Sequence, residues 1–588
     1  MKKSIVESLF WAGASLFVML GLIFGLMYGN LDSVRLHDVA RSLAVLLPLS
    51  VFATLLLMAI HRPLGRIFPA AIALYFSFYD INVFFQKFGL ADVLSFTVIL
   101  LCLLALYIAF RFVDGLRFSL YTFVVTAAMA SATLFAIAPS LFHAPPPRID
   151  AYFEKESLAA VSAYRGGSSD LPDIIYVVPD RYASRSTLRT EFDFDNSAFY
   201  AELRKRGFFV FEDSWANYPK TFQSMASTLN SGYLQDFTKT YGADSSDQRP
   251  IYQVLENNVV QDRLRKLGYR FHNYGNWWEP TRVNRWAAVN YQGYPPDSLQ
   301  NLSNFERGLL QRTPTMKIAR NIAWFFIDAE DKAEDNLECG RIKRKLRRIR
   351  EVGNQAQPVF VLAHLLIPHY PFLMNAAGQC LDFRPLLYFG KNWNEFKAAY
   401  VEYLKYFNSA ILEIIDEQLR RRGRTGRKLL FVLQADEGPF PKKYLGDVSD
   451  RYDFSRFSQR EIKMKTGIIN ALLLPDSLRR DIPKLVTPVN NWRIIFNALT
   501  GSKMNLLPDK IFIYPTKKNI FNFCEVTDIV TKPDAAISSC KNLYGKASSL
   551  TWQGIEGSYL IARDVRFGSF ADSMVTVSIR PLLGLKRT

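Results

Sequence analysis

The hydrophobic pattern divides the chain into two unlike parts. Long apolar stretches fill the first 143 residues, whereas shorter apolar runs alternate with amphipathic segments from residue 171 onward. The long stretches cover residues 5–27, 39–60, 67–85, 93–112 and 120–142. Each is close to the ~20 residues that a helix needs to cross a bilayer. We therefore predict a transmembrane anchor of about five helices in residues 1–143.

Two features of the anchor predict its topology. The first apolar stretch is longer than the core of a cleaved signal peptide and is followed by further spans, so we expect it to remain in the protein. Basic residues are more frequent in the turns on one side (Lys2, Lys3, Arg62, Arg66, Arg111, Arg117) than on the other (Arg35, Arg41, Lys87). The positive-inside rule then places the N-terminus on the cytoplasmic side of the membrane, which in a bacterium is the inner membrane. Five crossings put everything after about residue 143 on the periplasmic or extracytoplasmic side.

The second part has the pattern of an α/β domain. Strands are predicted at residues 174–178, 208–211, 269–272, 359–365, 429–434 and 468–474, and helices at 197–206, 254–267, 397–422 and 491–499. Strands separated by helices indicate βαβ units, a mainly parallel central sheet and helices on both faces. We predict a linker at 144–170, a catalytic domain at 171–511 and a mixed, β-rich subdomain at 512–588.

The cysteines fit an exported domain. Cys102 lies in a span, which leaves Cys339, Cys380, Cys524 and Cys540 outside the membrane. An even number in an oxidising compartment is compatible with two disulfides. Proximity in the sequence favours Cys524–Cys540 as one pair, and four unpaired thiols are the alternative.

Polar residues follow the predicted strands, where a parallel sheet gathers its ligands. In chain order these residues are Asp180, Thr221, Trp278, His369, Asp436 and Glu437. Asp180, Asp436 and Glu437 offer oxygen ligands for one divalent cation, either Mn, Mg, Ca or Zn. A cation would activate the hydroxyl of Thr221 as a nucleophile, because a free hydroxyl reacts poorly at neutral pH. We predict a metal-assisted transfer site with Thr221 both as catalytic residue and as metal ligand.

Other residues have competing interpretations. His369, Trp278, Arg282 and Arg285 are candidates to hold a phosphate and its head group. Ser224 is the rival nucleophile to Thr221, and either aspartate could instead cap a helix. His364 lies within an apolar run, so we interpret it as a core histidine. The basic run at 341–350 predicts a solvated helix face or lipid contact, because an exported domain does not meet nucleic acid.

Five motifs occur in an order that resembles a known family. They are DIIYVVPD (173–180), NYPKTFQSMASTLN (217–230), HLLIPHYPF (364–372), LQADEGP (433–439) and TPVNNWRIIFN (487–497). Together they resemble the sulfatase-like branch of the alkaline phosphatase superfamily. The anchor followed by an exported domain is similar to the layout of lipoteichoic acid synthase and the phosphoethanolamine transferases.

This resemblance implies an activity. Asp180 and Asp436 would be metal carboxylates, Thr221 the nucleophile that becomes phosphorylated, and His369 a substrate contact. The implied reaction moves a phosphoglycerol- or phosphoethanolamine-type head group from a membrane phospholipid to an envelope glycan or lipid. Glu437 stands where the family usually has histidine, which would favour a harder metal than zinc.

Composition and missing motifs narrow the alternatives. A net charge of +18 suits anionic lipid head groups or glycans. No Cys/Ser-x-Pro-x-Arg motif surrounds Thr221, which disfavours sulfate-ester hydrolysis. The remaining alternatives are a phosphodiesterase with water as acceptor and a catalytically silent scaffold for envelope-glycan assembly.

Overall fold

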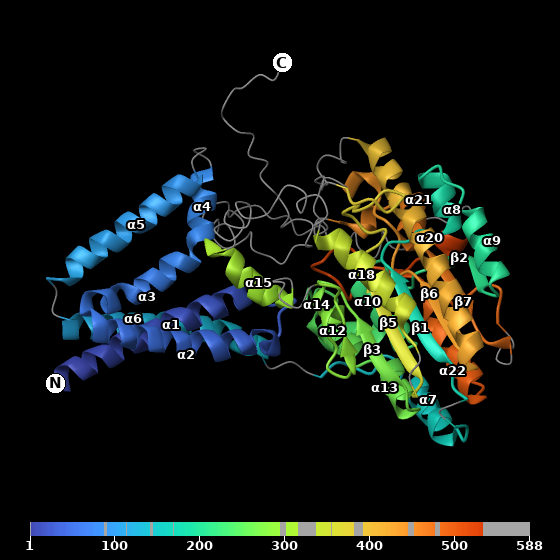
Figure 1. Cartoon of the computed structure of the whole chain (residues 1–588), viewed down its shortest axis with the longest axis horizontal. Helices are drawn as coiled ribbons and strands as arrows, with labels where there is room; N and C mark the ends of the chain where they lie inside the picture. The colour runs from blue at the N-terminus through green and yellow to red at the C-terminus, as the bar shows by residue number, and fades with distance from the viewer. Residues whose placement is uncertain are drawn as a thin grey trace, which may run out of the picture.

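The computed structural model describes residues 2–532 except 87–90, 113–114, 142–144, 168–169, 295–300, 316–336, 354–355, 382–391, 445–451 and 477–481. Figure 1 shows a helical anchor at one end of the molecule and an α/β domain at the other. This arrangement confirms the predicted fold class. The predicted boundaries after residues 143, 170 and 511 stay predictions. The predicted linker includes helix α7 (Ala151–Ala163), whose Phe153 is buried.

Among its described residues, the anchor contains four helices long and apolar enough to span a membrane, or five if a bent pair counts as one span. The four are α1 (Lys2–Tyr28), α2 (Leu36–Ile60), α5 (Ala91–Phe110) and α6 (Gly115–Leu141). The third predicted span is the bent pair: α3 (Arg62–Phe76) and α4 (Phe78–Gln86) meet at 54°. Asp80 lies in the first turn of α4 and pairs with Arg312 of the second part of the chain at 3.6 Å.

The central sheet has seven strands in the order β2-β7-β6-β1-β5-β3-β4. The strands are β1 (Asp173–Pro179), β2 (Phe209–Trp215), β3 (Arg270–Tyr274), β4 (Val289–Asn290), β5 (Val359–Leu365), β6 (Leu429–Gln434) and β7 (Gly467–Leu473). Strands β6, β1, β5, β3 and β4 are parallel, and β7 is antiparallel to both β6 and β2. The mainly parallel sheet is therefore confirmed.

Helices cover both faces of this sheet because its central strands are buried on both sides. Along β1, Ile174, Tyr176 and Val178 face one hydrophobic core, and Ile175 and Val177 face the other. The first core includes residues of α10 (Thr221–Leu229), α12 (Arg249–Glu256), α13 (Val259–Lys266) and α22 (Asn491–Thr500). The second includes residues of α8 (Arg185–Glu191), α9 (Ser197–Lys205), α18 (Leu337–Glu351) and α20 (Trp393–Thr425).

One predicted helix is divided in the structure. The segment 254–267 forms the end of α12 and all of α13, with a break at Asn257 and Asn258. The Asn258 side chain accepts a hydrogen bond from the backbone N–H of Gln261, so it caps α13. Because an asparagine cap satisfies free N–H groups at a helix N-terminus, a second helix begins at Val259 directly after the first one ends.

The remaining described elements connect the two parts and extend the domain. They are α11 (Gln235–Tyr241), α14 (Glu279–Arg282), α15 (Asn304–Gln311), α21 (Gln459–Thr466), β8 (Phe512–Ile513), β9 (Cys524–Glu525) and α23 (Thr527–Thr531), with single-turn helices at Lys442–Tyr444, Phe454–Arg456 and Pro488–Asn490. Helix α15 packs Phe305 and Leu309 among apolar residues of the anchor, including Met19 and Ile23.

The cysteines are partly as predicted. Cys339 on α18 forms a disulfide with Cys380, a pair that proximity in the sequence did not favour. Cys524 is disulfide-bonded as well, and its predicted partner Cys540 lies outside the described residues. Cys102 carries a free thiol.

Candidate metal centre

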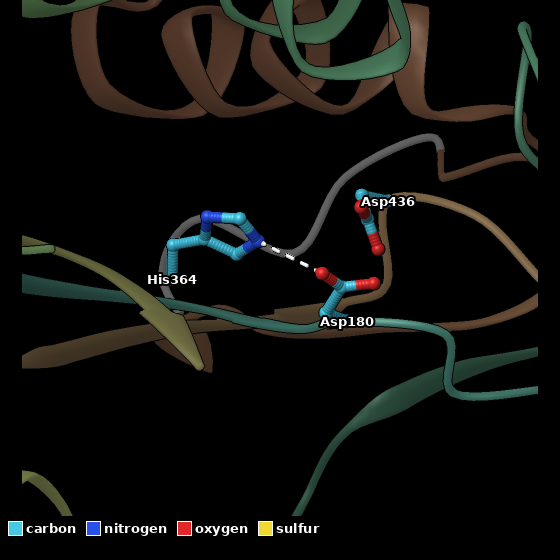
Figure 2. Close-up of side chains that lie close together, drawn as sticks. All are labelled: Asp180, His364 and Asp436. Atoms are coloured by element: carbon cyan, nitrogen blue, oxygen red, sulfur yellow. Dashed lines mark ion pairs between the residues drawn. The ribbon is translucent and has the colours of Figure 1, made fainter. Parts of the chain in front are cut away.

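Three buried side chains meet at the carboxyl edge of the sheet: Asp180, His364 and Asp436 (Figure 2). One potential ligand atom from each lies within 4.8 Å of the other two. Strand register explains the meeting. Val177 of β1 pairs with Leu433 of β6, so the two aspartates each lie three residues beyond a matched pair.

Each of the three side chains presents a buried polar atom that has no hydrogen-bond partner among the residues that the structure describes. These atoms are Asp180 Oδ1, Asp436 Oδ2 and His364 Nε2. Burial raises the pKa of Asp180 and of Asp436 to about 7, and the Asp180 carboxylate also raises that of Asp436. Burying polar atoms without hydrogen-bond partners, or two carboxylates close together, is unfavourable in free energy unless a cation binds between them. The donor set therefore fits a divalent metal ion.

The interpretation of His364 as a core histidine is confirmed as far as burial goes, because the side chain is 1% exposed, but the residue also belongs to the group of candidate metal ligands. Val178 of β1 pairs with His364 of β5, which places the imidazole beside Asp180, with Nε2 3.6 Å from Asp180 Oδ2. Burial lowers the pKa of His364 to about 4, so the ring is neutral, as a metal ligand must be. A histidine at the end of a strand whose neighbours end in aspartates is the sequence signal that could have found it.

Two neighbours set the orientation of the His364 ring. Its Nδ1 lies 2.9 Å from Asn276 Nδ2 and 3.0 Å from Thr281 Oγ1. The Asn276 amide nitrogen can only donate, so Nδ1 accepts this hydrogen bond, and the opposite ring nitrogen, Nε2, faces Asp180 Oδ2. Trp278 packs edge-on against the imidazole, with ring centroids 5.7 Å apart.

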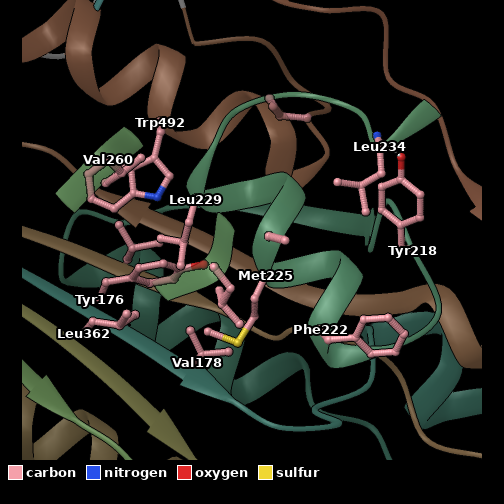
Figure 3. Close-up of a cluster of buried hydrophobic side chains, with 14 of the residues drawn as sticks. Tyr176, Val178, Tyr218, Phe222, Met225, Leu229, Leu234, Val260, Leu362 and Trp492 are labelled. Carbon is pink, nitrogen blue, oxygen red and sulfur yellow. Dashed lines mark hydrogen bonds between the residues drawn. The ribbon is translucent and has the colours of Figure 1, made fainter. Parts of the chain in front are cut away.

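Thr221 lies at the start of α10, beside this group. The Thr221 hydroxyl is close enough to Asp436 to lower the pKa of that carboxyl, which burial otherwise raises. Helix α10 is held in place because Phe222, Met225 and Leu229 are buried in the core that also contains Val178 of β1 (Figure 3). The rival Ser224 lies one turn further along, with a buried Oγ for which the described part of the chain offers no hydrogen-bond partner.

Glu437 does not join the group of three described donors. Its Oε1 lies 2.8 Å from Lys465 Nζ and 3.1 Å from Arg181 Nε. Burial alone would raise the pKa of Glu437, but Lys465, Lys220 and Arg181 together lower it to about 2. Glu437 is therefore a charged partner of lysine and arginine. The predicted shift towards a harder metal loses its basis, because these cations offset the extra negative charge.

The sequence predicted no role for three basic residues of the site, Lys465, Arg181 and Lys220. Lys465 Nζ, Arg181 and Lys220 Nζ lie 4.0, 5.0 and 5.1 Å from the centre of the Phe440 ring. Lys465 is 1% exposed, and burial lowers the pKa of its ammonium group to about 7 although the adjacent Glu437 carboxylate raises it. Lys465, Arg181 and Lys220 thus accompany the carboxylates of Asp180, Asp436 and Glu437, and Lys345 Nζ donates to the backbone oxygen of His364 at 3.2 Å.

The four predicted substrate residues divide into two pairs. Trp278 contacts His364, and the buried His369 interacts electrostatically with Arg181 and Glu437. In contrast, Arg282 pairs with Glu279 at 2.7 Å. Arg285 donates to Asn257 and stacks on Trp286. The structure therefore brings Trp278 and His369 to the site and places Arg282 and Arg285 in other contacts.

The fold and the site together define a class: a multi-span membrane protein with an α/β domain and a candidate Asp-His-Asp metal centre at its sheet edge. No protein-family model and no curated protein matches the chain. The similar solved structures include sulfatases and phosphoethanolamine transferases, the proteins that the sequence motifs resemble.

Three of these structures illustrate the similarity. The periplasmic domain of EcEptC from Escherichia coli is 11% identical, with a TM-score of 0.37 over 67% of this chain and 99% of that one. Lipooligosaccharide phosphoethanolamine transferase A from Neisseria meningitidis is 12% identical, with a TM-score of 0.32 over 84% and 95%. The putative sulfatase yidJ from Bacteroides fragilis is 14% identical, with a TM-score of 0.34 over 60% and 82%. At these values the argument for function rests on the residues of the site.

Proposed function

We propose that this protein is a metal-dependent transferase that moves a phosphorylated head group from a membrane phospholipid to an envelope glycan or lipid, with Thr221 as the nucleophile. The observation that carries the proposal is the buried trio of Asp180, His364 and Asp436 with unpartnered donor atoms beside the Thr221 hydroxyl. A scaffold without chemistry would have no need for three orphaned ligand atoms in one buried place.

The residues that would hold the cation are Asp180, His364 and Asp436, with the Thr221 hydroxyl as a further ligand. Two carboxylates and an imidazole suit zinc or manganese better than calcium, which prefers oxygen ligands alone. When bound, the metal supplies Lewis-acid stabilisation of the nucleophile and of the charge on phosphorus. A further role of Asp436 is to orient the Thr221 hydroxyl.

The proposed transfer has two balanced halves. Thr221 Oγ forms a bond to phosphorus while the bond from phosphorus to the diacylglycerol oxygen breaks, and the hydroxyl proton leaves with the alcohol. An acceptor hydroxyl then forms the new bond to phosphorus and Thr221 Oγ leaves, regaining a proton. The positive charges of Arg181, Lys220 and Lys465 favour a substrate that carries the negative charge of a phosphodiester.

We also propose that the domain faces the extracytoplasmic side of a bacterial inner membrane. The Cys339–Cys380 disulfide supports an oxidising compartment. The distribution of basic residues between the anchor turns supports the same orientation. This places the site on the side where an envelope glycan or lipid acceptor is available.

The test is intact-protein mass spectrometry of the full chain after incubation with phospholipid carrying a labelled head group and no acceptor. We expect one head-group phosphate adduct on the parent protein and none on Thr221→Ala. Ser224→Ala is the matched control, because it removes the neighbouring hydroxyl of the same helix, and it should keep the adduct. An adduct on Thr221→Ala would reject Thr221 as the nucleophile.

The same label separates a transferase from a phosphodiesterase. With acceptor present, a transferase moves the label onto the acceptor, whereas a hydrolase releases it into solution. Absence of both products and of the adduct in metal-loaded parent protein would favour the silent scaffold.

A further inference from the structure

An exposed tryptophan lies between two arginines on the exported domain. The Trp286 side chain is 42% exposed, and the guanidinium groups of Arg265 and Arg285 lie 4.7 and 4.8 Å from its ring centre. Val283, which is 41% exposed, lies three residues earlier in the chain. We call these four residues the Trp286 cluster. An exposed aromatic ring with a charged group on each side is unusual on a protein surface that contacts only water.

The Trp286 cluster is fixed to the backbone that adjoins the membrane anchor. Asn257 Oδ1 accepts hydrogen bonds from both Arg285 Nη2 and Trp286 Nε1, each at 2.9 Å. The preceding residue, Glu256, forms an ion pair at 2.7 Å with Arg35, the residue that caps helix α2. Arg285 also interacts electrostatically with His37 in the first turn of α2. These contacts connect the cluster to the N-terminal end of a membrane-spanning helix, and α12 and α14 lie on the anchor side of the domain (Figure 1).

The length of α2 places this end at the head groups. Its 25 residues rise about 37 Å at 1.5 Å per residue, which exceeds the ~30 Å hydrocarbon core. The first two turns of α2, with the exposed His37 and Arg41, therefore extend into the head-group layer. A cluster that interacts electrostatically with His37 and is linked to Arg35 through Asn257 and Glu256 lies near the same depth. Tryptophan is enriched at this depth because its ring is apolar while its N–H is polar.

We propose that the Trp286 cluster binds the phosphate of an anionic phospholipid head group and so docks the exported domain on the leaflet that α2 enters. The two guanidinium groups match an anionic phosphate in charge and in hydrogen-bonding geometry. Each arginine near a membrane surface contributes about a fivefold preference for anionic lipid. This docking is separate from the chemistry at Thr221 and does not depend on it.

The experiment uses the full chain reconstituted into phosphatidylcholine vesicles that contain phosphatidylglycerol. Bromine atoms, which quench tryptophan fluorescence, are placed near the head group of either lipid in otherwise identical vesicles. We expect brominated phosphatidylglycerol to quench the parent protein more strongly than brominated phosphatidylcholine. Trp286→Phe should lower this difference, because it removes the reporter closest to the bound lipid.

The double variant Arg265→Gln/Arg285→Gln should abolish the difference while keeping all nine tryptophans. The controls are Trp393→Phe, which removes a tryptophan that stacks on Phe396, and Arg420→Gln/Arg421→Gln, which removes two arginines from α20. Both controls should retain the preference of the parent. A preference unchanged in Trp286→Phe, or unchanged in the Arg265/Arg285 variant, would overturn the proposal.

Discussion

Single side chains decide whether the candidate centre can hold a cation. Asp180 and Asp436 provide charge, but His364 supplies the third donor, and its orientation depends on Asn276 and Thr281. Lys465 and Arg181 hold Glu437 in a second, separate set of contacts. The site therefore consists of a ligand group and a neighbouring charge-balanced pair.

The role of His364 predicts a loss of metal affinity. His364→Gln should weaken zinc or manganese binding by more than the about 10–100-fold that loss of a ligand's supporting partner causes. Isothermal titration of the metal-stripped full chain measures this change. His272→Gln is the matched control, because His272 is equally buried on β3 but lies outside the ligand group, and it should leave the affinity unchanged. Equal weakening in both variants would remove His364 from the site.

The buried pair of Glu437 and Lys465 predicts a change in stability. Lys465→Met should lower the free energy of unfolding by about 3 kcal/mol, because it removes the cation closest to the buried Glu437 carboxylate among the described residues. The double variant Glu437→Gln/Lys465→Met should recover part of this loss. Thermal unfolding in detergent measures both.

Lys443→Met is the control for that measurement, because Lys443 forms a comparable but more exposed pair with Glu461. Its cost should be about 0–1 kcal/mol. A Lys465→Met variant no less stable than Lys443→Met would show that the Glu437 charge is not held by lysine.

Strands and loops bring these side chains together at the scale of elements. The parallel register of β1 with β5 and β6 brings three strand ends to one edge, and β3 leads into the loop that orients His364. That loop approaches the backbone of α14 closely at Gly275. A Cβ on Gly275 would lie 2.0 Å from the carbonyl oxygen of Thr281, too near for any side chain.

Two glycine substitutions should therefore have opposite effects. Gly275→Ala should lower stability by about 1–3 kcal/mol, as overpacking does, and displace Thr281 from His364. Gly423→Ala in α20 should raise stability by about 0.5–1 kcal/mol, because a Cβ there meets nothing within 4 Å and alanine favours a helix. Thermal unfolding measures both, and metal affinity should fall only in Gly275→Ala. Equal effects of the two substitutions would contradict the close approach.

The anchor and the exported domain contact each other at the scale of the whole molecule. Arg35 pairs with Glu256 and Asp38 and is 7% exposed, whereas Arg41, which is 62% exposed, pairs with Glu306. Helix α15 adds apolar contacts to α1 and α2. The exported domain thus contacts the N-terminal end of α2 through a buried ion pair, Arg35–Glu256, and a more exposed ion pair, Arg41–Glu306.

The buried pair should contribute more to this junction. Arg35→Gln should cost about 2–3 kcal/mol, less than a fully buried pair because Glu256 is 20% exposed, while Arg41→Gln should cost about 0–1 kcal/mol. Hydrogen exchange of the full chain measures the effect as faster exchange in α12. Exchange that rises equally in both variants would contradict the difference in burial.

Local sequence determined much of this protein. Uninterrupted apolar stretches are enough to define membrane helices, and apolar runs separated by amphipathic segments define a mainly parallel sheet. The positions of Asp180 and Asp436 directly after two such runs were enough to predict that they share an edge. These properties depend on residues close together in the chain.

Tertiary structure decided what depends on distant residues. His364 becomes a donor only because β5 pairs with β1 in one register, and Glu437 is neutralised by Lys465 from another element. Cys339 meets Cys380 across 41 residues because the fold brings α18 to that loop. Arg285 belongs to the surface beside α2 because Asn257 holds it there. Hydrophobic pattern specifies which face of an element is buried, but only packing specifies which side chains then become neighbours.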